Sequence, residues 1–213
     1  MSSTDRPAPQ FRRPASLFPA RAEAIPGAPD PAESADLAHD SARALLDGVY
    51  RSSDPEVVAR VVRLAADQGL VELAALWSAS PATTLPGALW RLYVLHTWVQ
   101  RNGEDVVRRY REGSRTVPGL RYLSGFAEPP EVEQVQRTMD DILRGAFTGD
   151  LALALERAAA VATIAAHGTA HLVDRTDLPE QEQQATTVRA ERLLRTGEEL
   201  SAAARHAEAG RLD

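Results

Sequence analysis

The chain has 213 residues, of which 44% are hydrophobic and 25% charged, as is typical of a soluble globular protein with one sizeable core. Its net charge of −6 argues against a generally basic nucleic-acid binder but leaves room for a local basic patch. There is no cysteine, and all 24 basic residues are arginine. These absences exclude disulfides, thiolate chemistry, Cys-zinc sites, a Walker-A lysine and a Schiff-base lysine.

Residues 1–29 are rich in proline and carry a net charge of +2. Proline without apolar periodicity cannot bury enough surface to offset chain entropy, so we predict a disordered tail ahead of one domain over residues 30–213. The first residues lack the apolar core of a secretory signal. The most apolar run begins at Leu151, but Glu156 and Arg157 interrupt it, and we expect it to be too short to cross a bilayer. These features predict a cytoplasmic protein without membrane contact.

Helix-start patterns then follow one another along the chain. Asp30 followed by Pro31 predicts a first helix, and Asp54 followed by Pro55 predicts a second that ends near Gly69. A short helix is expected over residues 70–80.

The next two helices are expected over residues 85–102 and 104–113. Thr84 is placed to cap the first of them, which should stop at Gly103. Glu104 and Asp105 supply the acidic first turn of the second.

Residues 114–129 are expected to form a loop before a helix over 130–147. Asp150 is placed to cap an alanine-rich helix over residues 151–172, and Pro179-Glu180 opens a long polar helix. Nothing alternates with the period of a strand over more than a few residues. The predicted fold is all-α, a single bundle or stacked hairpins of seven or eight helices.

The last helix carries only a thin apolar stripe, made of Val188, Leu193 or Leu194, Leu200, Ala204 and Ala207. Such a stripe fits two arrangements. The helix either packs on the body or makes a coiled-coil contact, so a homo-oligomer through this helix stays open.

Aromatic residues gather in the helix over 85–102, although the chain is only 5% aromatic. At about 100° per residue, an apolar arc contains Leu92, Val94, Leu95, Trp98 and Val99. The candidate pocket lies on the other side, at Trp90, Tyr93, His96 and Gln100. We favour a core helix packed between two layers over a binding surface. Arg91 falls inside the apolar arc, where it needs a carboxylate or carbonyl partner.

Two patterns resemble metal sites. His167 and His171 share a helix face, with Asp174 one turn further on, and imidazole pairs at this spacing suit zinc or iron. Gly168 lies between the two histidines and the glutamate of a zinc-protease motif is missing, so we favour solvated histidines. Asp140 and Asp141 are adjacent and therefore point apart on a helix, which predicts a solvated face.

The sequence contains neither a nucleophile elbow nor a glycine-rich phosphate loop. No cofactor is therefore predicted, and an enzyme is the minority interpretation.

Arginine is concentrated between residues 101 and 121, with only three carboxylates and two interleaved tyrosines, Tyr110 and Tyr122. Two interpretations are open: a surface that binds phosphate or carboxylate, or intramolecular pairing with the acidic helices, which we favour. The six arginines are Arg101, Arg108, Arg109, Arg111, Arg115 and Arg121.

The tail contains an isolated apolar group, Phe11, Leu17 and Phe18, beside Arg12 and Arg13. An apolar group outside a core is expected to dock on a partner or back on the body. The Ser16-Leu17-Phe18 end resembles the last three positions of peptides by which bacterial proteins bind the replication sliding clamp, with Pro14 in place of the leading glutamine. Residues 12–16 also resemble a site for a basophilic kinase.

The favoured function is a non-enzymatic adaptor or regulatory protein that binds another macromolecule, most plausibly a protein, through the tail or the arginine segment. The first alternative is a small-molecule or metal-binding protein, with a pocket near Trp90, Tyr93, His96, His167 and His171 if their helices meet. The second alternative is nucleic-acid binding through the arginine segment.

Overall fold

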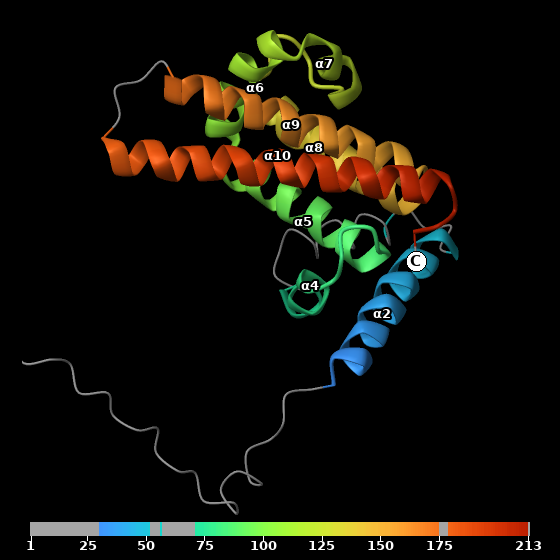
Figure 1. Cartoon of the computed structure of the whole chain (residues 1–213). Helices are drawn as coiled ribbons and strands as arrows, with labels where there is room; N and C mark the ends of the chain where they lie inside the picture. Colours follow the sequence, from blue (N-terminus) through green and yellow to red (C-terminus); the bar gives the residue numbers. More distant parts are fainter. Residues whose placement is uncertain (1–29, 52–55, 57–70, 175–178, 213) are drawn as a thin grey trace, which may run out of the picture.

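The computed structural model describes residues 30–51, 56, 71–174 and 179–212. These residues form eight helices and no strands, which confirms the predicted all-α fold (Figure 1). The predicted tail over residues 1–29 and the helix expected after Asp54 fall outside the described residues, apart from Glu56.

The first two described helices are α2 (Pro31–Arg51) and α4 (Val71–Ser78). As predicted, Asp30 caps α2, because its carboxylate accepts a hydrogen bond of 2.9 Å from the Ala32 amide. Trp77 on α4 is buried, and its indole nitrogen donates to Ser41 Oγ on α2 at 3.0 Å. Both helices also pack on α5 (Leu85–Arg101).

Helix α5 turns directly into α6 (Gly103–Thr116). Thr84 caps α5 as predicted and accepts a hydrogen bond from the Gly87 amide. Asn102 both ends α5 and begins α6, so the expected stop at Gly103 is a corner between two helices. Arg91 on α5 has the partners that its position requires, Glu199 Oε2 at 2.5 Å and the Gly87 carbonyl at 2.9 Å.

The loop expected over residues 114–129 is partly helical. Helix α6 runs to Thr116, and a short helix, α7 (Pro118–Ser124), follows and ends at Gly125 in the left-handed conformation. Pro118 lies in the first turn of α7, where a missing N–H costs little. The Tyr110 hydroxyl on α6 donates to Ser124 Oγ at 2.6 Å, since Ser124 itself donates to the Arg121 carbonyl. This buried contact holds α7 against α6.

The remaining helices are α8 (Val132–Thr148), α9 (Leu151–Asp174) and α10 (Glu180–Glu208). Helices α9 and α10 run side by side in opposite directions (Figure 1). Asp150 caps α9 as predicted, since its carboxylate accepts from the Leu153 amide at 3.0 Å. Helix α10 packs on α9 along part of the predicted apolar stripe. Leu200 and Ala204 of the stripe are buried, whereas Val188 and Leu194 are 37% exposed.

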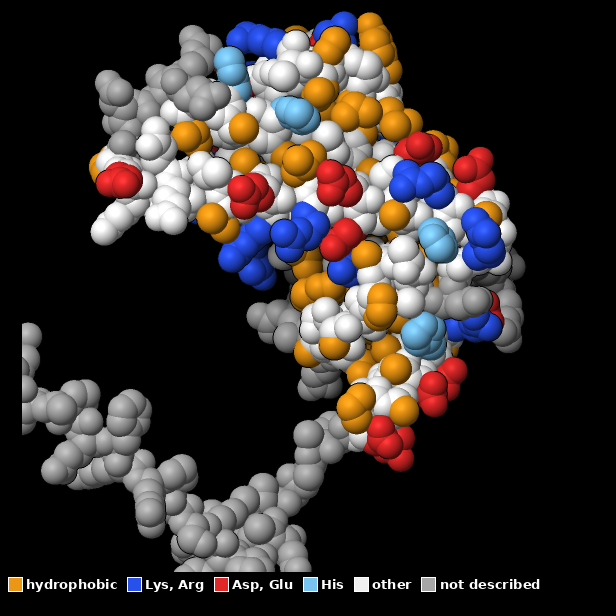
Figure 2. Space-filling view, in the orientation of Figure 1, with side chains coloured by type: hydrophobic (Ala, Val, Ile, Leu, Met, Phe, Trp, Pro, Cys, Tyr) orange, Lys and Arg blue, Asp and Glu red, His pale blue; other side chains and the backbone are white. Residues whose placement is uncertain are grey.

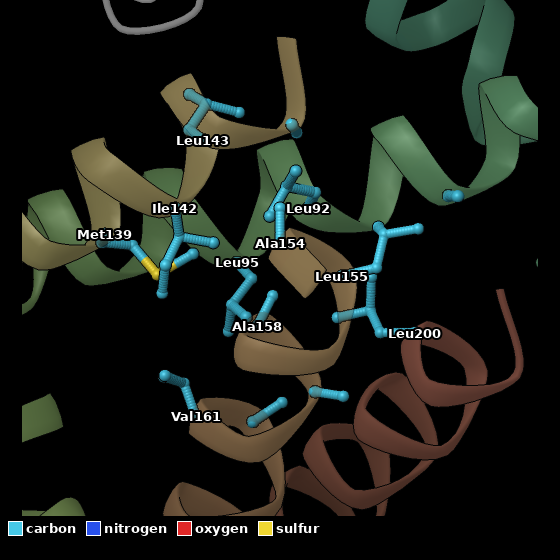
Figure 3. Close-up of a cluster of buried hydrophobic side chains, with 14 of the residues drawn as sticks. Leu92, Leu95, Met139, Ile142, Leu143, Ala154, Leu155, Ala158, Val161 and Leu200 are labelled. Carbon is cyan, nitrogen blue, oxygen red and sulfur yellow. The ribbon is translucent and has the colours of Figure 1, made fainter. Parts of the chain in front are cut away.

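The core forms where α5, α8, α9 and α10 meet (Figure 3). Small alanines on α9 let the larger side chains of its neighbours approach. The residues labelled in the figure are Leu92 and Leu95 of α5, Met139, Ile142 and Leu143 of α8, Ala154, Leu155, Ala158 and Val161 of α9, and Leu200 of α10. The apolar arc expected on α5 is only partly right, because Val94 is 42% exposed, whereas Leu89 and His96 are buried.

Glycines allow α9 to contact α6 backbone to backbone. A Cβ on Gly113 of α6 would lie 1.8 Å from the Ile164 carbonyl oxygen, and one on Gly168 of α9 would lie 1.8 Å from the Arg109 carbonyl oxygen. Gly197 of α10 is similarly close to α9, since its Cβ would lie 2.4 Å from Thr163 Oγ1. At Gly113 and Gly168, where the contact is with backbone, no side chain larger than hydrogen fits without moving α6 and α9 apart.

The apolar run on α9 is longer than the sequence suggested. Residues Leu151–Val173 are long and apolar enough to cross a membrane by length and composition, although 61% of the apolar window is buried inside the protein. Core helices of soluble proteins share these properties, so this helix says little about membrane association.

Substituting the crossing glycines tests this packing. Gly113→Ala and Gly168→Ala should each lower the free energy of unfolding by about 2 kcal/mol or more, because the added methyl group meets backbone. The control is Gly145→Ala on α8, where an added Cβ meets nothing within 4 Å. It should stabilise the protein by about 0.5–1 kcal/mol. Urea unfolding of the three variants measures both effects, and equal changes would contradict the packing described.

Candidate functional site

A partly buried polar cluster joins α5 to α8. His96 is 1% exposed, and its Nε2 lies 2.7 Å from Asp140 Oδ1. Gln100 donates to the same Asp140 oxygen at 2.8 Å and to the Gln136 carbonyl at 3.1 Å. In return, Gln136 Nε2 donates to the Gln100 carbonyl at 2.9 Å. Two predicted pocket residues, His96 and Gln100, therefore do come together, with partners from α8.

The protonation of this cluster follows from its geometry. A carboxylate only accepts hydrogen bonds, so His96 Nε2 carries a hydrogen and donates it to Asp140. The other ring nitrogen, Nδ1, is buried with no hydrogen-bond partner among the described residues. Asp140 itself keeps 38% of its side chain exposed. The contacts of this cluster join two helices.

Trp90 and Tyr93 do not belong to this cluster. Both side chains are partly buried against the core, with ring centroids 6.0 Å apart. They lie one to two turns before His96 on α5, in keeping with the core interpretation of this helix.

The two α9 histidines lie against different neighbours. His167 lines a groove of 320 Å³ between α9 and α10, together with Ala170 and Leu194. His171 is exposed, and its Nε2 lies 3.9 Å from Glu112 Oε2 on α6. Asp174 is the last residue of α9, and its side chain is not among those described. Among the described residues, no three His, Asp or Glu side chains are grouped to hold a metal ion.

Asp105 organises the arginines of α6. Its two carboxylate oxygens accept from Arg108 and Arg109, each at 2.6 Å. Arg109 is 5% exposed and also donates to Thr169 Oγ1 on α9 at 2.6 Å. Arg109 therefore belongs to the contact between α6 and α9 and is not available to a partner.

The other arginines of this segment reach the surface. Arg115 pairs with Glu112 at 3.2 Å, and Arg111 donates to the Pro130 carbonyl at 2.8 Å. Arg121 pairs with Glu128 and lies 5.0 Å from the Tyr122 ring centroid, whereas Arg101 is exposed. The partner of Arg115 belongs to α6 itself, and the partners of Arg111 and Arg121 belong to the segment before α8.

Another pocket was not suggested by any sequence pattern. It has a volume of 730 Å³ and lies between the start of α9 and the end of α10, where Leu153, Arg205 and Leu212 line it. It contains none of the residues that the sequence offered as site candidates.

Sequence reasoning also missed Asp140 as the partner of His96 and Gln136 as the partner of Gln100. The expectation of a solvated aspartate pair fits Asp141, which is 61% exposed and pairs with Arg144 on its own helix. No local signal separates the two aspartates, because their difference arises from the position of α5.

Comparison with known proteins adds no assignment. No protein-family model, no curated protein and no solved structure matches this chain.

The neighbouring aspartates of α8 provide a matched test of the cluster. Asp140→Ala should lower the free energy of unfolding by about 1–3 kcal/mol, because buried His96 and partly buried Gln100 lose their acceptor. Asp141→Ala removes an exposed pair and should change it by no more than about 0.5 kcal/mol. Thermal unfolding of both variants makes the comparison, and equal losses would mean that the cluster contributes little.

Asp105 makes stability depend on acid pH. Burial raises the pKa of its carboxyl, but hydrogen bonds from Arg109 and Arg108 outweigh burial and hold this pKa below the ordinary value of 3.8. The carboxylate thus stabilises the fold at pH values above that ordinary pKa. This contribution to stability is lost as the pH falls through the pKa of the folded state.

Stability measured by urea unfolding between about pH 5 and pH 2 should show this loss in the native sequence. In Asp105→Asn the decline should be shallower. Glu104→Gln is the control, since it removes an exposed carboxylate from the same turn. If Asp105→Asn declines as steeply as the native protein, Asp105 is not the linked group.

Proposed function

We propose that this chain is a non-enzymatic cytoplasmic adaptor or regulatory protein that binds an anionic surface of another macromolecule, foremost a protein, through α6. The observation that carries the proposal is the exposed arginine face of this helix. Arg108, Arg111 and Arg115 are spaced by three and four residues, so their side chains share one face. Arg108 and Arg115 keep 65% and 71% of their side chains exposed despite their ion pairs.

Charge favours an anionic partner for this face. Asp105 is shared by Arg108 and Arg109, whereas Arg111 donates to a neutral carbonyl. Positive charge is therefore left over on a protein whose net charge is −6. Guanidinium groups bind carboxylates and phosphates in a bidentate geometry, which supplies both attraction and orientation. Exposed pairs within a helix are weak, so a partner can exchange them at little cost.

The buried polar groups support a binding role over a catalytic one. His96 and Asp140 join α5 to α8, and Arg109 and Thr169 join α6 to α9. Each of these contacts is between helices of the core. In the proposal the tail supplies a second contact, with Phe11, Leu17 and Phe18 as apolar anchors beside Arg12 and Arg13.

Replacing the arginine face with glutamine tests the proposal. The triple variant Arg108→Gln, Arg111→Gln and Arg115→Gln should lose the partner that co-purifies with the full chain from its native host. A matched variant changes three exposed arginines elsewhere, Arg137, Arg144 and Arg192, and should retain it. Thermal stability should stay within about 0.5 kcal/mol in both, because the sites are exposed.

A chain lacking residues 1–29 separates the two contacts. A partner lost with the tail alone assigns binding to residues 1–29, and a partner retained by the α6 variant refutes the arginine face. A nucleic-acid partner would instead be recognised by affinity that falls steeply with salt.

A further inference from the structure

A histidine of α9 lies at the edge of the arginine face of α6. The side chain of His171 is 45% exposed, and its Nε2 lies 3.9 Å from Glu112 Oε2. The other oxygen of Glu112, Oε1, accepts a hydrogen bond from Arg115 at 3.2 Å. One carboxylate therefore lies between an arginine of the exposed face and a histidine of the neighbouring helix.

Helical geometry places this carboxylate beside the exposed arginines. At about 100° per residue, Glu112 lies about 40° from Arg108 and about 60° from Arg115 around the axis of α6. It lies between these two arginines and Arg109, which contacts α9 through Thr169. The surface of α6 thus continues from the arginines, across Glu112, onto α9 at His171.

The charge of this group depends on one proton. Histidine is the side chain whose charge ordinarily changes within the physiological range of pH. While His171 is neutral, Glu112 offsets the charge of Arg115. Once His171 is protonated, Glu112 is shared between two cations, and the three side chains together carry one net positive charge.

The other helices packed on α9 present their charged groups elsewhere along it. Glu191 of α10 lines a groove with His167, one turn before His171. Helix α7 borders α9 near Glu156, and α5 and α8 pack on its first half (Figure 3). On α9 itself Asp174 follows His171 by three residues, and its side chain lies outside the described residues.

The two α9 histidines thus have different surroundings. Figure 2 shows acidic and basic side chains interspersed along α10, the helix that His167 faces across its groove. His171 instead lies beside α6, where the exposed arginines share one face. A proton gained at His171 therefore adds to a surface that already favours anions.

We infer that His171 is a proton-dependent member of the anion-binding face of α6, so that this face binds its partner more tightly as the pH falls. The inference rests on the function proposed above for the arginine face and names the condition that regulates it. Coupling of this kind is reciprocal. An anionic partner that prefers the protonated form must also favour protonation of His171, so binding takes up protons from the solvent.

The pH dependence of binding to a short aspartate peptide tests the inference, because this probe stays ionised between about pH 5.5 and pH 8. The affinity of the full chain should rise about fivefold over this range as the pH falls, as expected for one added surface charge. His171→Gln should lose most of this rise. The control is His39→Gln on α2, a helix that packs on α4, α5 and α8, and it should keep the rise.

A permanent charge at the same position tests the sign of the effect. His171→Arg should bind the aspartate peptide at about pH 8 as tightly as the native chain does at about pH 5.5, with little further change as the pH falls. Thermal unfolding should show that both substitutions at this 45% exposed side chain leave the fold intact.

Calorimetry measures the linked proton directly. Titrations of the aspartate peptide at about pH 6.5, in two buffers of different ionisation enthalpy, report how many protons are taken up on binding. The native chain should take up a fraction of a proton, and His171→Gln should take up less. Equal uptake by the two chains would contradict the inference.

The triple variant Arg108→Gln, Arg111→Gln and Arg115→Gln separates the two levels of the argument. If this variant loses the aspartate peptide while His171→Gln keeps the full rise in affinity, the arginine face stands and its regulation by His171 is wrong. If the triple variant binds as tightly as the native chain, or the native chain binds at no pH, the arginine face is wrong and the inference falls with it.

Discussion

The contact between the backbones of α6 and α9 is the constraint on which the other helices depend. Gly113 and Gly168 face the opposite helix at positions where a single methyl group would overlap a carbonyl oxygen. Helix α9 is thereby fixed against α6, and its alanines are then covered by α5, α8 and α10. A close helix crossing requires small residues at particular positions, and overall hydrophobicity alone cannot supply it. This constraint therefore favours one specific arrangement of the helices.

Polar side chains add to that specification, at the same contact between α6 and α9 and at a second one between α5 and α8. Arg109 donates to both Asp105 and Thr169, and Nε2 of His96 has its acceptor only where α8 presents Asp140. A buried polar group without a partner is costly, so a shifted helix would lose more than its apolar contacts. These side chains form hydrogen bonds between neighbouring helices.

The sequence predicts the local features of this structure well and the contacts between distant segments poorly. The caps at Asp30, Thr84 and Asp150 are formed by one side chain and the next turn, so they were correctly predicted. Helix α7 was missed because proline and glycine in its first residues indicate a turn. The His96 cluster could be half predicted, since His96 and Gln100 lie one turn apart, but its carboxylate belongs to another helix.

The corner at Asn102 has a mechanical consequence. One residue ends α5 and begins α6, and Gly103 is buried directly after it. A peptide chain changes direction only at its φ and ψ torsions, so very few torsions separate the two packed helices at this junction. Any change in the angle between α5 and α6 is therefore confined to the torsions of Asn102 and Gly103.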